Sequence, residues 1–496
     1  MTKMVFNSFS FLIFFPIVLL FYRVLPKRVR WVMLLAASYY FYMSWQPDLI
    51  YLILFTTVVS YLCSLGIEKT SKKGVKKLLL VTALVASLSV LFFFKYFNFL
   101  SHNVTAFLNL IRIPVSDFTL NLILPVGISF YTFQTLSYVI DVYRGTMKAE
   151  KHFGYYALYV SYFPQLVAGP IERPENLLPQ LRADNPFSAR DTVDGLKIMA
   201  VGFFKKIAVA DVISKYVDAV YNGVGTADKS LLNGFTVFIA TALFAVQIYC
   251  DFSGYTDIAI GCARVMGIRL MRNFNDPYSG VSIRDFWRRW HISLTSWFTD
   301  YIYIPLGGSR KGKVKHYANI FIVFLISGIW HGAAWTYILW GVMHGLYQIV
   351  GNLTEKPRSA LRERLNITDA GWYRVFRRGV TFLLVMIAWV AFRANSLADM
   401  TVLYKTLFLG WGGMSISASL SALGLGLFSA ATVLLSIFVT VQLDRQIALK
   451  DPSDSAFKGV SPDRAGMYIY LVWTIAAAWL ILLSSSGASS FIYFQF

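Results

Sequence analysis

The chain has 496 residues, of which 56% are hydrophobic and only 15% are charged, and its mean hydropathy is +0.55. Soluble domains are about 45–50% apolar and about 25% charged, so this composition excludes a disordered chain, a collagen-like fibre and a disulfide scaffold, and it indicates a membrane protein. The formal net charge of +20 does not indicate nucleic-acid binding, because many basic residues lie in short loops between apolar runs, as they do on the cytoplasmic side of membrane proteins.

Apolar segments long enough to cross a bilayer recur along the whole chain. A spanning helix needs about 20 mostly apolar residues. The clearest candidates are residues 8–25, 31–47, 49–67, 78–97, 233–250, 379–394, 421–443 and 466–485. Less regular apolar segments lie at 119–140, 154–170, 195–220, 252–270 and 317–351. Together they predict an all-α, multi-span membrane protein with roughly ten to thirteen transmembrane or re-entrant helices.

Basic clusters predict the orientation of these helices. The first cluster, at Lys27, Arg28 and Arg30, is separated from the second, at 69–77, by two candidate spans. Both clusters can therefore face the cytoplasm, which places the N-terminus outside. No cleavage signal follows the first apolar run, so we expect that run to be a retained first span.

Two segments are too polar to face lipid. Residues 171–197 contain three prolines among mixed charges, and residues 271–316 combine charged residues with large aromatic ones. Polar, irregular backbone at membrane depth occurs only where protein or a water-filled cavity covers it. We therefore expect both segments to form interfacial or re-entrant structure around a cavity.

His331 is the most informative of the six histidines. It lies in the apolar segment 317–351, whose 35 residues are slightly too few for two full crossings of about 20 residues each. The turn of this hairpin, near Gly328, His331 and Gly332, is therefore predicted to lie below the opposite membrane surface. An ionisable residue at such a depth is a functional-site hypothesis, since a neutral imidazole can act as a general base. A structural histidine, hydrogen-bonded to a neighbouring helix, is the alternative.

His291 follows the run FWRRW and is the second candidate. An interfacial helix would explain the arginines there by contact with headgroups, and it would place Trp287, Trp290 and Trp297 in an aromatic belt. It does not explain the histidine, which is no special membrane anchor. A structural role and an acyl-orienting or catalytic role both remain open for His291.

The other candidate ligands favour no cofactor or metal site. His102, His152, His316 and His344 are expected to be solvated or to have packing roles. No HExxH or carboxylate–histidine spacing indicates a metal site. The three cysteines, Cys63, Cys250 and Cys262, have no CxxC spacing and are expected to pack in the protein interior.

Five segments of the chain resemble the membrane-bound O-acyltransferase family, and most closely its bacterial alginate O-acetyltransferase branch. They are PVGISFYTFQTLSYVIDVYRG (125–145), FPQLVAGPIERP (163–174), DFSGYTDIAIG (251–261), the segment 275–308 with FWRRWHIS, and SGIWHGAAWTYILWGVMHG (327–345). The pair FWRRWHIS and WHGAAW, in that order, is highly specific. The resemblance implies that His331 matches the family's essential histidine and that His291 matches the second histidine of the pattern, with a supporting role in the same tunnel.

The resemblance also implies the architecture and the reaction. We expect a single domain over 1–496, with the catalytic core at about 120–350, in which a ring of helices surrounds a central tunnel. Such a protein, in the bacterial inner membrane, would take an acyl group, usually acetyl, from a cytoplasmic thioester such as acetyl-CoA, with no bound cofactor. It would pass the group to hydroxyls of a polysaccharide outside, often through an extracytoplasmic partner acyltransferase. Alternatives are D-alanyl transfer to teichoic acid and, in another class, a transporter or flippase, which the lack of internal repeats disfavours.

Overall fold

The computed structural model describes residues 4–167, 169–226, 231–368, 370–412, 415–448, 476–478 and 480–481. Every regular element in these ranges is a helix, which confirms the all-α prediction. The chain divides into two compact units, Met1–Ala200 with Tyr255–Met271 and Val201–Gly254 with Arg272–Phe496. Most of the predicted span 466–485 lies outside the described residues.

The first unit begins with a helical hairpin whose ends are set by local chemistry. The Ser8 side chain accepts a hydrogen bond from the Phe11 backbone N–H and caps the first helix. This helix ends before Pro26, which has no backbone N–H to continue it. The helices of the unit are α1 (Phe9–Val24), α2 (Lys27–Met43), α3 (Ile50–Lys69), α4 (Lys73–Leu91), α5 (Phe97–Leu110), α6 (Ile128–Arg144), α7 (Phe153–Ser161), α8 (Phe163–Leu166), α9 (Pro174–Arg182) and α10 (Ala189–Phe203), which extends into the second unit.

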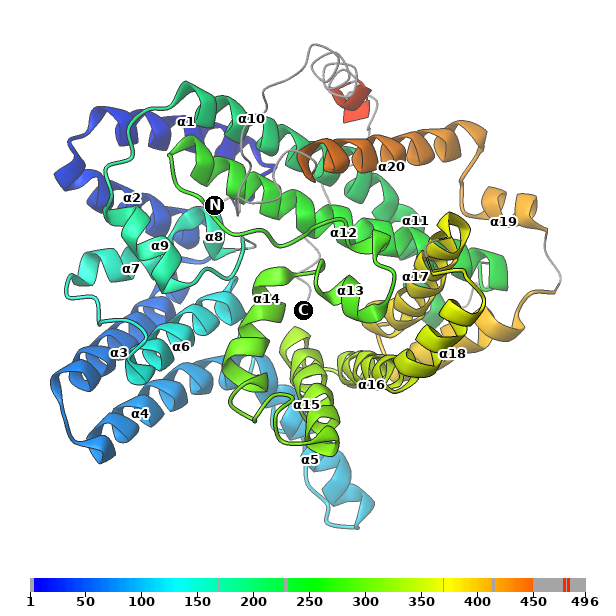
Figure 1. The fold of residues 1–496 in the computed structure, drawn as a ribbon, viewed down its shortest axis with the longest axis horizontal. Coiled ribbons are helices and arrows are strands. Elements are labelled where there is room, and N and C mark those ends of the chain that lie inside the picture. The colour runs from blue at the N-terminus through cyan, green and yellow to red at the C-terminus, as the bar shows by residue number, and fades with distance from the viewer. Residues whose placement is uncertain are drawn as a thin grey trace. The chain divides into compact units, whose positions relative to one another are not determined.

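Within the first unit, α3, α4 and α6 pack against one another (Figure 1). Tyr138 of α6 and Tyr156 of α7 lie at the centre, with ring centroids 4.3 Å apart. The Tyr156 hydroxyl is 2.6 Å from the Ser60 hydroxyl of α3. Buried hydroxyl groups that pair in this way allow aromatic residues to fill the interior without unsatisfied polar atoms.

The second unit contains a long hairpin and several short helices. The short helices confirm that the polar segment 271–316 is irregular. The helices are α11 (Asp211–Tyr221), α12 (Gly234–Val265), whose C-terminal part belongs to the first unit, α13 (Ile283–Trp287), α14 (Ile292–Phe298), α15 (Lys313–His331), α16 (Trp335–Arg364), α17 (Gly371–Arg393), α18 (Leu397–Leu409), α19 (Ile416–Ala422) and α20 (Leu427–Ala448). The π-helices η3 (Phe204–Ala210) and η6 (Thr299–Tyr303) follow α10 and α14.

Helix α12 differs from the prediction of two apolar segments at 233–250 and 252–270. It is one continuous helix of 32 residues, Gly234–Val265. The helix continues through Gly254. A side chain at this position would come within 2.8 Å of the Gly202 carbonyl oxygen. The glycine therefore serves a close helix approach rather than a turn.

Five helices are long and apolar enough to cross a membrane, judged by length and composition over the described residues. They are Pro47–Lys69, Lys73–Leu110, Gly234–Val265, Gly371–Arg393 and Leu427–Asp444. Other predicted apolar segments consist of shorter pieces: 154–170 contains α7 and α8, and α1 has 16 residues. The chain is therefore a helical membrane protein in which spans alternate with shorter helices.

Candidate active site

The α15–α16 hairpin positions His331. The two helices run side by side (Figure 1), and a side chain at Gly328 would lie 2.5 Å from the Tyr337 carbonyl oxygen. A side chain at Gly341 would lie 2.4 Å from the Phe324 carbonyl oxygen. The absence of side chains at both positions lets the helices approach closely. The predicted turn is confirmed: α15 ends at His331, and α16 begins at Trp335.

The His331 side chain is buried among aromatic rings. The residue is 4% exposed, and its ring centroid lies 4.9 Å from that of Trp340, at an interplanar angle of 89°. The ring of Phe392, on α17, lies 5.3 Å away. His331 is the last residue of a 19-residue helix, where the helix dipole favours a positive charge. An imidazole at this place can accept a proton with the help of the dipole, in surroundings that exclude bulk water.

His291 occupies a strained backbone position just before α14. Its φ of 45° and ψ of 54° lie in the left-handed region, which is uncommon for residues other than glycine. Such positions cost about 1–3 kcal/mol and persist only where surrounding contacts fix them. Here the Leu294 and Thr295 backbone N–H groups both donate to the His291 carbonyl oxygen, each at 3.0 Å. The left-handed turn thereby directs the imidazole into the interior.

The His291 ring is fully buried. Its exposed fraction is 0%, and the Phe252 ring lies 4.7 Å away in an edge-to-face arrangement. Burial lowers the pKa of His291 to about 3. His291 is therefore neutral at physiological pH.

The structure brings the two predicted histidines together around one tryptophan. The Trp330 ring lies 6.0 Å from the ring of His291 and 4.9 Å from that of His331. All three residues belong to the second unit. Two buried imidazoles near one indole form a dry site in which a proton can be taken up next to a second polar group.

His344 adds a third buried histidine, which the sequence did not single out. It is fully buried, so of the two roles expected for it the solvated one is wrong. The Trp287 indole N–H donates to His344 Nδ1 at 3.2 Å. This bond leaves the proton of a neutral imidazole on Nε2, a buried atom without a hydrogen-bond partner among the described residues. The ring of Trp340 lies 5.0 Å from His344 and 4.9 Å from His331, so one indole contacts both histidines.

The tryptophans of the 271–316 segment do not form an aromatic belt, and that alternative is wrong. Trp287, Trp290 and Trp297 are 6%, 1% and 5% exposed. Trp290 instead packs against Trp389 of α17 at 5.2 Å. The tryptophans build the interior around the histidines, because the short helices α13 and α14 turn them inward.

The remaining histidines have other neighbours. His102 is exposed and lies 3.0 Å from Asp117, His152 caps α7, and His316 lies 2.7 Å from the Tyr303 hydroxyl. No group of three or more metal-binding side chains occurs in the described part of the chain. The three cysteines are free and buried, as expected.

A buried ionic group in the second unit was also missed by the sequence analysis. The Lys206 ammonium lies 2.7 Å from the Asp211 carboxylate and 2.8 Å from that of Asp251, and all three side chains are at most 3% exposed. The signal was a pair of lysines inside the apolar segment 195–220. A charge in such surroundings needs a buried partner, but the sequence does not say which acidic residue supplies it.

In the first unit, Glu172 of the 163–174 segment is buried. The Asn176 side-chain amide donates to its carboxylate at 2.6 Å, and the Met271 backbone N–H donates to the other oxygen. Burial raises the pKa of Glu172 to about 7, although both hydrogen bonds act in the opposite direction. Because its acceptor oxygens are occupied by local donors, Glu172 holds α9 in place next to Met271.

Comparison with known proteins points to one family. A family model described as "MBOAT, membrane-bound O-acyltransferase family" matches residues 150–393. A probable alginate O-acetylase, AlgI, of Pseudomonas aeruginosa is 36% identical over 467 residues, which cover 91% of this chain and 85% of that protein. A peptidoglycan O-acetyltransferase of Helicobacter pylori is 34% identical, covering 83% of this chain and 81% of that protein. A teichoic acid D-alanyltransferase of Bacillus subtilis is 28% identical, covering 55% of this chain and 68% of that protein.

Proposed function

Because this chain belongs to the membrane-bound O-acyltransferase family, we propose that it moves an acetyl group from a cytoplasmic thioester donor to hydroxyls of a polysaccharide outside the membrane. The chain is an O-acyltransferase of a membrane family. What we propose is the identity of the acyl group, the identity of the donor and the direction of transfer across the membrane.

The observation that carries the proposal is the burial of His291 and His331, whose rings both lie near that of Trp330. Both histidines lie inside the segment that the family model matches. Two unrelated structural histidines would not need to lie near the same tryptophan at the end of a hairpin. A base kept dry beside a second neutral imidazole is suited to acyl transfer, in which water would otherwise hydrolyse the thioester.

In the proposed mechanism, His331 acts as the general base. Its neutral imidazole takes the proton of an acceptor hydroxyl while the hydroxyl oxygen attacks the thioester carbonyl carbon. The carbon–sulfur bond then breaks, the thiolate leaves, and the proton passes from the imidazolium to the thiolate. Such proton transfer typically contributes about 10²–10⁴-fold to the rate. The helix dipole at the end of α15 stabilises the imidazolium that forms.

His291 has a supporting role in this proposal. Since it stays neutral, it can orient the acyl group through a hydrogen bond without competing for the proton. The fixed left-handed backbone at this residue supports a positioning role, because strained conformations are kept where geometry matters.

Acetyl transfer is favoured over D-alanyl transfer by the extent of similarity. The O-acetylating relatives from Pseudomonas and Helicobacter are at least 34% identical over more than four fifths of this chain. The D-alanyltransferase is 28% identical over little more than half. We propose the bacterial inner membrane as the location and an extracytoplasmic acyltransferase as the partner that selects the acceptor polymer.

The test is mass spectrometry of acyl groups released by mild base from the envelope polymers of cells with the wild-type chain or with His331→Ala. Loss of acetate in the variant supports the proposal, whereas loss of D-alanine moves the assignment to teichoic acid modification. An unchanged profile from a well-expressed, membrane-inserted His331→Ala protein contradicts acyl transfer by this site.

A further inference from the structure

Helix α16 is much longer than the partner with which it forms a hairpin. It has 30 residues, whereas α15 has 19, and the two helices meet at the same turn. The last 11 residues of α16, 354–364, are therefore about 16 Å of helix that α15 does not match. This extension and the first turns of α17 form the α16–α17 connection, residues 353–378.

The α16–α17 connection lies on the basic side of the membrane helices. A helical hairpin returns to the side from which it starts, so the end of α16 lies on the same side as Arg310 and Lys311, which precede α15. The positive-inside rule assigns this side to the cytoplasm. Residues 353–378 contain seven basic and three acidic residues. Their excess of positive charge is complementary to the anionic lipids of a cytoplasmic leaflet.

The end of α16 carries an exposed apolar stripe. Four large apolar side chains, each at least 55% exposed, lie on one face of the helix: Val350, Leu353, Leu361 and Leu365. Pro357, on the same face, adds no polar group. A helix end with an apolar stripe on one face and basic residues on the others is suited to lie in the interface between headgroups and acyl chains.

The first turns of α17 continue this apolar surface into a membrane span. Trp372, Val375 and Phe376 are 64%, 65% and 58% exposed, and Leu383, further along the same face, is 45% exposed. The whole of Gly371–Arg393 is apolar and long enough to cross a bilayer. Because one face runs from the connection into a helix that meets lipid, the material that covers it is the bilayer rather than an acidic protein.

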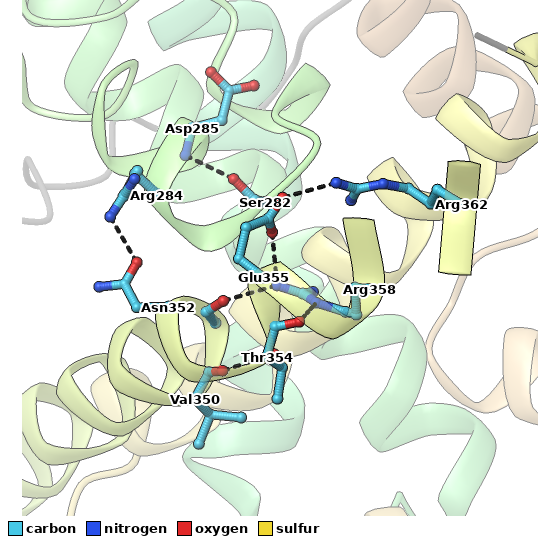
Figure 2. Close-up of polar contacts among 10 residues, drawn as sticks. Ser282, Arg284, Asp285, Val350, Asn352, Thr354, Glu355, Arg358 and Arg362 are labelled. Carbon is cyan, nitrogen blue, oxygen red and sulfur yellow. Dashed lines mark hydrogen bonds and ion pairs between the residues drawn. The ribbon is translucent and has the colours of Figure 1, made fainter. Parts of the chain in front are cut away.

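Part of the positive charge of the connection is neutralised within the protein. Figure 2 shows Arg358 and Arg362 both paired with Glu355, at 3.1 and 2.8 Å. The Arg284 guanidinium donates to the Asn352 side-chain oxygen at 2.6 Å, also in Figure 2, and so fixes α16 to α13 just before the extension. These contacts hold the extension in place and leave other arginines to face outward.

Two arginines of α17 have no such partner. Arg374 and Arg378 are four residues apart, so they lie on one face of the helix, where both can approach a single phosphate. Neither side chain makes an ion pair or a hydrogen bond with another residue in the described part of the chain. Arg374 is exposed, and Arg378 is half-buried. Positive charge that the protein does not neutralise attracts an anion from outside.

We propose that the α16–α17 connection binds an anionic phospholipid of the bilayer, with its phosphate between Arg374 and Arg378 and its acyl chains along the exposed apolar face of α17. The occupant is a lipid rather than free phosphate, because that apolar face would otherwise lie in water. The bound lipid would hold together two helices of the histidine site. Trp340 of α16 and Phe392 of α17 both contact His331.

The experiment measures lipid binding to the full-length protein in detergent micelles by native mass spectrometry. The first phosphatidylglycerol should bind at least about tenfold more tightly than phosphatidylcholine, whose headgroup has no net charge. The double variant Arg374→Gln/Arg378→Gln should lose at least about tenfold of this affinity, since each basic residue near an anionic membrane surface contributes about fivefold. Equal binding of the two lipids by the wild type would overturn the inference and leave the arginines to an acidic protein.

Arg310→Gln/Lys311→Gln is the matched control. Both residues are exposed and belong to the second unit, so this variant removes the same charge on the same side of the membrane, but outside the connection. It should change phosphatidylglycerol affinity by less than about twofold, because salt screens distant charges. An equal loss in the two double variants would mean that only overall charge matters, which overturns the inference.

A folding control and a headgroup competitor complete the test. The double variant should unfold at the same temperature as the wild type in phosphatidylcholine nanodiscs; if it is less stable, Arg374→Gln alone, which changes an exposed side chain, should weaken binding about fivefold. Glycerol phosphate, the headgroup without acyl chains, should not displace the lipid, and displacement would overturn the inference. Binding is measured without turnover, so the result is independent of the proposed acyl transfer.

Discussion

The second unit buries polar side chains in two different ways. Around Lys206, one ammonium is held between two carboxylates, so each charge has a partner of opposite sign. Around His331, the neighbours are the rings of Trp330, Trp340 and Phe392, and no carboxylate takes part in the ring contacts. The first arrangement fixes charges by pairing them, and the second keeps imidazoles away from bulk water.

This difference shows which buried group can exchange a proton during a reaction. A paired buried charge is held by its partners and has no freedom to exchange a proton at low cost. A neutral imidazole among aromatic rings can change protonation once, during the reaction, when a substrate hydroxyl is placed beside it. We therefore assign Lys206, Asp211 and Asp251 to the fold and the histidines to acyl transfer.

The largest effect is expected from breaking the ionic group. Lys206→Met leaves the carboxylates of Asp211 and Asp251 buried without their cation, which should cost about 3–5 kcal/mol and greatly reduce the amount of folded protein. Thermal unfolding of the purified protein, monitored by fluorescence-detection size-exclusion chromatography, measures this loss of stability. The triple variant with Asp211→Asn and Asp251→Asn should recover much of the loss, and an equally unstable triple variant would contradict charge pairing as the cause.

The next effect concerns activity alone. His331→Ala should reduce acyl transfer about 100-fold or more, as for the loss of a general base, while the melting temperature stays close to that of the wild type. Acetate release from envelope polymers and thermal unfolding are measured on the same preparations. His102→Ala is the control, since that imidazole is exposed and belongs to the first unit.

A smaller effect is expected at the hydrogen bond between Trp287 and His344. His344→Phe removes the acceptor of the Trp287 N–H and leaves this donor buried, at a cost of about 1–3 kcal/mol. Trp287→Phe combined with His344→Phe should be less destabilised than the sum of the single changes. Strict additivity in this double-mutant cycle, measured by thermal unfolding, would show that the bond has no energetic role.

Part of this architecture could be predicted from the sequence. The apolar segment 317–351 correctly predicted a hairpin with His331 at its turn, and the dense charges of 271–316 correctly predicted a segment that is not a simple span. Both predictions depend on local composition and on the length that a bilayer requires.

The rest depends on contacts between distant segments. Nothing near His344 in the chain shows that Trp287, 57 residues earlier, is its donor. The local signal was Trp340, four residues before it, which placed an indole on the same helix face. In the same way, Lys206 was visible as a charge in an apolar segment, but its partner Asp251 comes from another helix.

The last prediction tests whether burial keeps the imidazole of His291 uncharged at acidic pH. Because burial lowers its pKa from 6.5 to about 3, the unfolded chain binds a proton below pH 6.5 that the folded protein does not bind. Stability should therefore be fully present above pH 6.5 and fall as the pH decreases towards 3. Between pH 7.5 and pH 5 the expected loss is about 2 kcal/mol, and His291→Gln, which cannot take up the proton, should lose less over the same interval. Melting temperatures of both proteins at the two pH values measure the difference. Identical pH dependence would mean that His291 titrates in the folded protein as it does in the unfolded chain, and the contrast between a charge-paired and an uncharged buried group would then not hold at this residue.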